Sequence, residues 1–408
     1  MPLLNFLREN GQWLLAGALL SLLSSFGQTF FISIFAAEIR AEFGLGNGAW
    51  GGLYTLGTGA SAVAMVWAGG LTDRYRARVL APFILTGLAL ACLLMSVTTS
   101  AVMLVAVIFL LRFCGQGMTS HIAMVSMSRW FVAQRGKALA FATLGFAIGE
   151  AMLPLSFVAM KANGADWRGL WRLAAVLVLI GLAVLLVLLR RERTPQSFAQ
   201  TEISAGMGGR HWTRREAMHH WLFWIMVPAL IGPPAFGTAF LFHQVAFTGA
   251  KGWDHIELVR YFPLYTFLAV GAGLCWGWAL DRFGTGRLIP WSHLPAVAGF
   301  TLFGLAETPA MAGMGLACYA VTTGSQATLP SAFWAEHFGT RHVGSIKAVT
   351  MAFMVLGSAI GPGLTGALLD LGVPLSTQYG VIAGWFLCGA ALMWVGTRRV
   401  RRSLAVAA

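Results

Sequence analysis

Apolar blocks of about 20 residues recur from one end of this 408-residue chain to the other. A helix needs about 20 apolar residues to cross a hydrocarbon layer about 30 Å thick. The chain is 57% hydrophobic and only 11% charged, well below the charge of a typical soluble protein. The sequence therefore excludes a single water-soluble core and predicts an all-α polytopic membrane protein.

Breaks at charged, proline or glycine positions divide the chain into twelve candidate spans. An even number of spans places both termini on the same side of the membrane. Most lysines and arginines fall in loops on that side, so the positive-inside rule predicts cytoplasmic termini in a bacterial-type inner (plasma) membrane. The same placement accounts for the net charge of +13 without a nucleic-acid partner. The expected spans are 13–36, 50–71, 79–99, 101–128, 137–160, 169–189, 221–247, 258–280, 288–306, 309–335, 345–369 and 375–397.

A long, basic, polar stretch separates the first six spans from the last six. We expect an N-terminal six-helix bundle over residues 1–190, a cytoplasmic linker over 191–219 and a C-terminal six-helix bundle over 220–408. The halves resemble each other, since the sequence from Gly69 to Arg74 is echoed from Gly277 to Arg282. Repeated six-span units are typical of secondary transporters.

These two segments share a pattern of small residue, apolar residue, Asp-Arg and then basic residues, which resembles the signature loop of the major facilitator superfamily. Arg112-Phe113-Cys114-Gly115 resembles the family's fourth-span arginine motif. The segment from Trp130 through Arg135-Gly136-Lys137 to Pro154 is similar to the hairpin of the monocarboxylate and oxalate–formate branches. The resemblance implies two pseudo-symmetric six-helix bundles that transport a solute by alternating access.

The resemblance also implies that the signature loops act as a conformational latch on the cytoplasmic side. Glycines allow helices to approach closely in a membrane, and aspartates can accept hydrogen bonds from helix N-termini or arginines. The alternative is that the aspartates only anchor their own loops. The predicted latch residues are Gly69, Asp73, Arg74, Arg129, Gly277, Asp281 and Arg282.

Arg112 and Glu150 are two ionisable residues deep inside predicted spans. From the nearest cytoplasmic turn Arg112 lies about 25 Å away and Glu150 about 20 Å away, at 1.5 Å per residue. A lone charge at the centre of a span costs about 2.5–3.5 kcal/mol, so a partner is expected. We predict an ion pair or a shared water cluster, in which Glu150 carries protons and Arg112 binds an anion; the alternative is a structural pair that fixes helix register.

Further polar and aromatic side chains fall on spans that the resemblance places around a central substrate path. The Pro233-Pro234 pair is expected to break or bend the seventh span there. Together with Arg112, the predicted substrate-binding residues are Gln28, Tyr54, His243, Gln244, Tyr265 and Gln326, and the wider candidates are Thr29, Phe31, His121, Phe242 and Thr323.

No phosphate-binding loop, zinc-ligand spacing or nucleophile elbow occurs in any predicted extramembrane segment. The five cysteines fall inside apolar blocks without paired spacing. We therefore expect no enzymatic activity, no cofactor and no metal. The expected partners are a small-molecule substrate, protons and the lipid bilayer, and the expected state is a monomer.

Two kinds of transport remain open. Arg112 favours proton-coupled movement of a small carboxylate or other organic anion, because a guanidinium binds carboxylates bidentately. An abundance of Phe, Met and Trp together with an interior acid would also suit a proton-driven exporter of amphipathic drugs or metabolites. The alternative from another functional class is a non-transporting membrane sensor or scaffold. Such a protein would need a sizeable soluble output domain, which the sequence does not contain.

Overall fold

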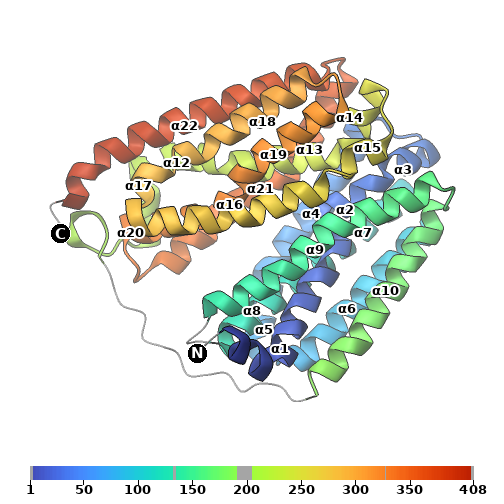
Figure 1. The fold of residues 1–408 in the computed structure, drawn as a ribbon, viewed down its shortest axis with the longest axis horizontal. Coiled ribbons are helices and arrows are strands. Elements are labelled where there is room, and N and C mark those ends of the chain that lie inside the picture. The colour runs from blue at the N-terminus through green and yellow to red at the C-terminus, as the bar shows by residue number, and fades with distance from the viewer. Residues whose placement is uncertain (1–2, 132–134, 191–204, 327, 406–408) are drawn as a thin grey trace. The chain divides into compact units, whose positions relative to one another are not determined.

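The computed structural model describes residues 3–131, 135–190, 205–326 and 328–405, and it contains no β-strand within these ranges. The chain forms two compact units, Met1–Gln200 and Thr201–Ala408 (Figure 1). The boundary between them falls inside the segment expected as a linker, of which residues 191–204 lie outside the described ranges.

The first unit holds the first six expected spans. Span one is divided into several short helical pieces, and span four contains a π-helical stretch in its middle. In chain order the helices are α1 (Leu3–Leu23), η1 (Ser24–Gly27), α2 (Thr29–Ile32), η2 (Ser33–Phe35), α3 (Ala36–Phe43), α4 (Asn47–Ala68), α5 (Leu71–Arg74), α6 (Ala77–Val97), α7 (Ala101–Leu110), η3 (Leu111–Thr119), α8 (Ser120–Trp130), α9 (Arg135–Ala162) and α10 (Trp167–Leu188).

The second unit holds the remaining six expected spans and begins with two short helices. The helices are η4 (Met207–Gly209), α11 (Arg214–His219), α12 (Trp221–Gly232), η5 (Pro233–Gly237), α13 (Thr238–Phe242), α14 (Gln244–Lys251), α15 (His255–Val259), α16 (Phe262–Phe283), α17 (Thr285–Leu288), η6 (Trp291–His293), α18 (Leu294–Leu305), α19 (Pro309–Gln326), α20 (Leu329–Phe338), α21 (Val343–Asp370) and α22 (Leu375–Ala405).

Eight helical stretches among the described residues are long and apolar enough to cross a membrane, and a ninth is added if the bent pair of span one is counted. The other three expected spans are also helical. Two of them, α4 and α19, contain several Gly, Ser and Thr residues, which make them less apolar. The third, α18, is only 12 residues long.

The starts and ends of several helices follow from local sequence. The Asp166 side chain accepts a hydrogen bond of 2.9 Å from the Gly169 amide, which caps α10, and Ser100 caps α7 in the same way. Gly44 ends α3 with φ of 61°, a left-handed conformation that glycine adopts without the steric cost of a side chain.

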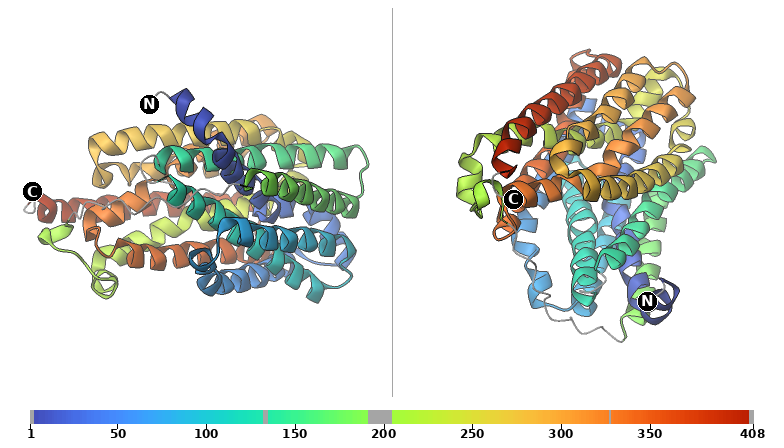
Figure 2. Two further views of the ribbon diagram at one scale, coloured as in Figure 1. Left: turned by 90° about the horizontal axis from the view of Figure 1, so that it is seen from below. Right: turned by 60° about the vertical axis from the view of Figure 1, so that its left-hand side comes forward.

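In the first unit, α1 packs along α9, and α6 packs along α10 (Figure 2). The approach of α9 to α1 depends on glycine: a Cβ atom at Gly145 would overlap the backbone of Ala18, and one at Gly149 would overlap the Ser25 side chain. Small residues commonly mediate such contacts between membrane helices. These glycines therefore bring α9 against the part of span one that leads into its break.

An ionic contact ties span five to span one at the far end of α9. The Lys161 ammonium lies 2.7 Å from the Glu38 carboxylate and donates a hydrogen bond of 2.5 Å to the Ile34 carbonyl. It also lies 5.5 Å from the centre of the Phe35 ring. These contacts fix η2 and α3, which follow the break in span one, to the end of α9.

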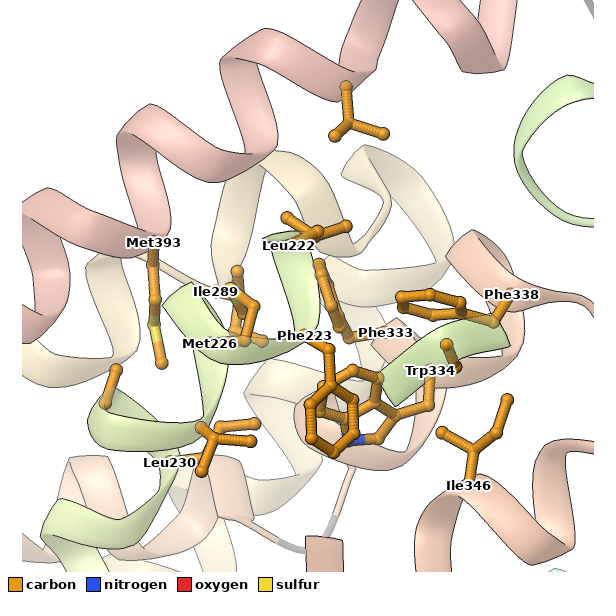
Figure 3. Packing of buried hydrophobic residues seen from close by; sticks show 14 of the residues in the cluster. Leu222, Phe223, Met226, Leu230, Ile289, Phe333, Trp334, Phe338, Ile346 and Met393 are labelled. Carbon is orange, nitrogen blue, oxygen red and sulfur yellow. The ribbon is translucent and has the colours of Figure 1, made fainter. Parts of the chain in front are cut away.

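In the second unit, α18 packs against both α19 and α22, and α16 packs along α19. A separate hydrophobic cluster joins α12 to α20, where Phe223 lies against Trp334 with ring centres 5.3 Å apart (Figure 3). Both side chains are almost fully buried, as are Leu222 and Phe338 beside them.

Residues 205–219, which we call the strap, belong to the second unit and pack on the end of α20. The Trp212 amide donates to the Phe338 carbonyl at 3.0 Å, and Met207 is buried in the same hydrophobic cluster as Phe223 and Trp334. A Cβ atom at Gly206 would overlap the backbone at Gly339. Half of the segment expected as a linker is therefore a docked part of the second unit.

Candidate functional site

Span one is interrupted in the middle. After η1 the backbone of Gln28 is extended, with φ of −85° and ψ of 155°, and the helical pieces on either side meet at 48°. A break of this kind deprives nearby carbonyl groups of their helical partners. Inside a membrane such carbonyls must find other donors.

Arg112 supplies the donor. Its Nη1 atom donates to the Gly27 carbonyl at 3.2 Å and to the Thr29 hydroxyl at 3.2 Å. The guanidinium carbon lies 5.5 Å from the centre of the Tyr54 ring, and the Tyr54 and Thr29 hydroxyls lie 2.5 Å apart. Span four thus holds the break in span one through the Arg112 guanidinium, and span two contributes the hydroxyl and the ring of Tyr54.

Glycine makes this contact possible. A Cβ atom at Gly27 would overlap the Leu111 carbonyl, and one at Gly115 would lie 2.6 Å from the Gly27 Cα atom. Leu111 and Gly115 belong to the π-helix η3, a form that often occurs at functional sites. The two glycines allow the backbones of spans one and four to touch, which places Arg112 beside the break.

Arg112 is only 2% exposed, and no other Lys or Arg among the residues with described side chains is buried. Its described contacts are with neutral groups, and its Nε atom has no hydrogen-bond partner among the described residues. The predicted direct ion pair with Glu150 is not among these contacts. Instead, the Gly27 carbonyl, freed by the break, lies within reach of the guanidinium and accepts from its Nη1 atom.

Glu150 is half-buried and follows Gly149 directly on α9. Because Gly149 lies against Ser25, the acid is carried on the helix that packs next to the broken region of span one. Arg112 and Glu150 therefore belong to two helices that both contact the same short stretch of span one.

The other candidates of the first unit divide between the break, the first signature loop and the aromatic core. Gln28 and Tyr54 are buried at the break. His121 instead lies with its Nε2 atom 3.2 Å from the Gly69 carbonyl, at the signature loop. Phe31 is fully buried among aromatic residues, with its ring 4.9 Å from that of Phe157, and serves as core.

The candidates of the second unit form two separate groups. The Tyr265 hydroxyl donates to the Thr323 hydroxyl at 3.1 Å, which joins spans eight and ten. His243 lies with its Nε2 atom 2.8 Å from the Pro362 carbonyl of span eleven. The side chain of Gln244 lies 3.1 Å from His255, at the start of the next span.

The remaining candidates of this unit are Gln326 and Phe242. The Gln326 side chain contacts Ser325 on its own helix, and its Oε1 atom has no hydrogen-bond partner among the described residues. Phe242 is buried against the ring of His243.

The two signature loops are held differently. In the first, Arg129 donates to the Thr72 carbonyl at 2.5 Å, and Gly69 is contacted by His121. The side chain of Asp73 lies outside the described residues, while Arg74 is exposed.

In the second signature loop, Asp281 and Arg282 are exposed, and a Cβ atom at Gly277 would meet open space, so the close helix approach expected there is not formed within its unit. This loop has an anchor that the sequence did not indicate. The Glu336 carboxylate accepts hydrogen bonds from the Thr285 amide at 3.0 Å and hydroxyl at 2.6 Å, which caps the start of α17. Glu336 was missed because it lies more than 50 residues away in sequence, and a capping interaction of that range leaves no local signal.

Comparisons with known proteins agree with this architecture. Residues 17–362 match the Major Facilitator Superfamily, whereas no curated protein matches the sequence. One similar solved structure is a bacterial homologue of the human lysosomal transporter Spinster, with a TM-score of 0.72, 16% identity, and coverage of 97% of this chain and 98% of that one.

Another is the nucleoside transporter NupG, with a TM-score of 0.71, 13% identity, and coverage of 94% of this chain and 98% of that one. At these identities the likeness concerns the fold. The match of the sequence itself covers most of the chain, including both signature loops and Arg112. The protein is therefore a transporter rather than an enzyme, and it belongs to the Major Facilitator Superfamily.

Proposed function

We propose that this transporter moves a small organic anion, a carboxylate in the simplest case, together with a proton. The observation that carries the proposal is the buried guanidinium of Arg112, which is surrounded by neutral groups. A buried charge is unfavourable unless an opposite charge compensates it. A carboxylate would provide that charge and could use the Nε donor that has no partner among the described residues.

Glu150 is the proposed proton carrier. It lies on α9, which packs against the same stretch of span one that Arg112 holds. A change in the conformation of the break can therefore alter the positions of both helices. Binding of an anion to Arg112 removes a positive charge from this region, and loss of positive charge favours the protonated form of a nearby carboxyl group.

The alternative of a drug or metabolite exporter rested on the many aromatic residues. In the second unit a large share of these pack on one another. Phe240 and Phe303 stack with ring centres 4.1 Å apart, and Phe300 lies 5.8 Å from Tyr379. All four are buried, so they form core rather than a surface for an amphipathic ligand, which favours the anion.

The proposal is tested with purified protein in liposomes that contain a pH-sensitive dye. Addition of lactate, pyruvate or benzoate should acidify the interior faster than in empty liposomes, whereas a lipophilic cation such as tetraphenylphosphonium or a nucleoside such as uridine should not. Arg112→Gln should abolish the acid-induced signal. The exposed Arg172→Gln is the matched control and should leave the signal unchanged.

Glu150→Gln should abolish pH-driven accumulation of the acid but retain exchange of labelled for unlabelled acid. Acidification by the cation instead of the acids would replace the anion proposal with the exporter. Full proton dependence in Glu150→Gln would remove Glu150 from the role of proton carrier.

We also propose that both termini are cytoplasmic, that the protein is a monomer in a bacterial-type inner membrane, and that the signature loops latch one state of the transport cycle. The distribution of Lys and Arg supports the orientation. The bonds of Arg129 and His121 to the first loop support the latch. Side-specific labelling of single cysteines at Ser403 and Lys251 should find opposite accessibility, and equal accessibility would reject the orientation.

A further inference from the structure

Span seven contains two consecutive prolines in its middle, Pro233 and Pro234. Proline has no amide N–H, so it cannot make the bond that an α-helix needs with the carbonyl four residues earlier. For Pro233 that carbonyl belongs to Ala229, which is buried on α12. A carbonyl left unpaired in a membrane helix is unfavourable, so another donor is needed.

His293 provides this donor. Its Nε2 atom lies 2.9 Å from the Ala229 carbonyl oxygen, and the side chain is 0% exposed. Because a carbonyl only accepts, Nε2 must carry the hydrogen. His293 lies at the end of η6, immediately before α18, so the bond crosses from span nine to span seven.

Close packing fixes the imidazole in this position. A Cβ atom at Gly389 of α22 would lie 3.4 Å from the His293 ring and 3.3 Å from the Ala229 Cβ atom. The ring of Phe386, also on α22, lies 5.5 Å from the imidazole. On its other side the Nδ1 atom lies 3.2 Å from the Ser292 hydroxyl.

Two further helices hold the same part of span seven by side-chain donors. The Tyr319 hydroxyl of α19 donates to the Pro233 carbonyl at 3.0 Å. The indole N–H of Trp385 on α22 donates to the Pro228 carbonyl at 3.3 Å. The backbone of span seven around Pro233 is therefore held by spans nine, ten and twelve as well as by its own hydrogen bonds.

We propose that His293 is a positioning residue that takes the place of the amide missing at Pro233 and so fixes the course of span seven at its π-helical stretch η5. A bond donated by a side chain of another helix can break and form again without unwinding the backbone. Span seven can therefore change the course of its backbone at η5 during the transport cycle, and His293 holds the course described here. The inference rests on the transporter fold and is independent of the substrate.

The test uses restoration of the missing amide. His293→Phe keeps an aromatic ring but removes the donor, whereas His293→Gln keeps an N–H group at a similar reach. Pro233→Ala returns an amide that can donate to Ala229 and should make His293 dispensable. Pro234→Ala is the matched control, because its amide would face the carbonyl of Leu230 instead.

Two measurements report the result in full-length protein in detergent or liposomes. The first is the distance between spin labels at Trp221 and Ala250, which are exposed at the two ends of span seven. The labels are introduced in a cysteine-free variant, and their distance depends on the course of the span between them. Thermal unfolding reports the stability. Loss of one hydrogen bond should lower the unfolding temperature of a unit of this size, about half of the chain, by about 2–4 °C.

We expect His293→Phe to shift or broaden the label distance and to lower the unfolding temperature, and His293→Gln to preserve both. The double variant with Pro233→Ala should regain the distance and temperature of Pro233→Ala alone, and the double variant with Pro234→Ala should not. The proposal is overturned if His293→Phe changes neither quantity, if His293→Gln is as damaging as His293→Phe, or if Pro234→Ala restores the label distance as well as Pro233→Ala.

Discussion

The Nη1 atom of Arg112 on span four lies 3.2 Å from the carbonyl oxygen of Gly27 on span one. A cation thus occupies the position where the broken helix of span one exposes its last carbonyls, which carry partial negative charge. The same cation contacts Thr29 on the other side of the break. This single side chain therefore joins both halves of span one to span four, and several consequences can be measured.

Thr29→Val should destabilise the first unit, because the Thr29 hydroxyl lies between Arg112 and the Tyr54 hydroxyl. Loss of a hydrogen bond to a charged group costs about 1.5–3 kcal/mol. Denaturation of the purified protein would report the change. Thr143→Val is the control, because the Thr143 hydroxyl is exposed and donates to the Leu139 carbonyl on its own helix. Equal losses in the two variants would mean that the hydroxyl network at the break adds no stability.

Gly27→Ala and Gly145→Ala should both be strongly destabilising, because the added methyl group would overlap the Leu111 carbonyl or the Ala18 backbone. Overpacking of this kind costs about 1–3 kcal/mol. Gly52→Ala is the matched control, because a Cβ atom there meets open space. Thermal unfolding should separate the variants, and a loss in Gly52→Ala as large as in Gly27→Ala would contradict the role of close helix approach.

Tyr379→Phe should stabilise the second unit. The ring lies among Phe240, Phe247 and Phe303, and the buried hydroxyl has no hydrogen-bond partner among the described residues. Removing an unsatisfied hydroxyl relieves a desolvation cost of about 1–3 kcal/mol. Tyr319→Phe should have the opposite sign, because its hydroxyl donates to Pro233. Unfolding temperatures of the two variants check this, and a fall in both would show that Tyr379 has a partner in solution.

Lys161 and Glu38 should show a measurable coupling energy in a double-mutant cycle with Lys161→Met and Glu38→Gln. The pair is 2.7 Å apart with side chains 15% and 31% exposed, and coupled neighbours typically give about 0.5–3 kcal/mol. Arg172 and Asp166, which are 64% and 59% exposed and 3.7 Å apart, should give about 0–1 kcal/mol. A coupling no larger than that of the exposed pair would argue against a role for Lys161 in holding η2 and α3.

Acid should loosen α11 within the strap. Hydrogen bonds from the Thr213 amide and hydroxyl lower the pKa of Glu216, which completes a capping box. A lowered pKa in the folded state means that the stabilisation is present above the ordinary carboxyl range and is lost as pH falls through the folded value. Protection of residues 214–219 against hydrogen exchange, taken relative to the unprotected rate at each pH, should therefore fall as the pH is lowered below the ordinary carboxyl range. Glu216→Gln should exchange faster at neutral pH and lose this pH dependence, and an unchanged profile would exclude the cap.

The sequence was sufficient for those features that repeat over many residues. Apolar blocks and the placement of basic residues give the helical class and the two halves, and the Asp-Arg loops give the family, which the match over residues 17–362 confirms. The branch within the family, the substrate and the coupling ion stay predictions. They depend on a few side chains whose chemistry several kinds of transporter share.

The site was harder to predict because its partners are backbone atoms. The apolar blocks placed Arg112 inside span four, where an ion pair or a shared water cluster with Glu150 was expected; its described contacts are a carbonyl, a hydroxyl and a ring. The Gly27 carbonyl becomes available only because span one breaks at Gln28, where the sequence contains no proline. In span seven the prolines signalled freed backbone groups. Nothing local indicated that His293, about 60 residues later, would donate to the carbonyl that Pro233 leaves unpaired.

The docking of the strap on α20 has a consequence for how such a protein can be divided. Its residues from Gly206 onward share backbone contacts and a buried core with the second half, so they would be needed for that half to be made as a separate polypeptide. A gene split between codons 190 and 205 would give each product its own complete set of internal contacts. A split at codon 219 would leave Met207 and Trp212 on the wrong fragment and would remove the hydrogen bond and the ring contact that Trp212 makes with Phe338.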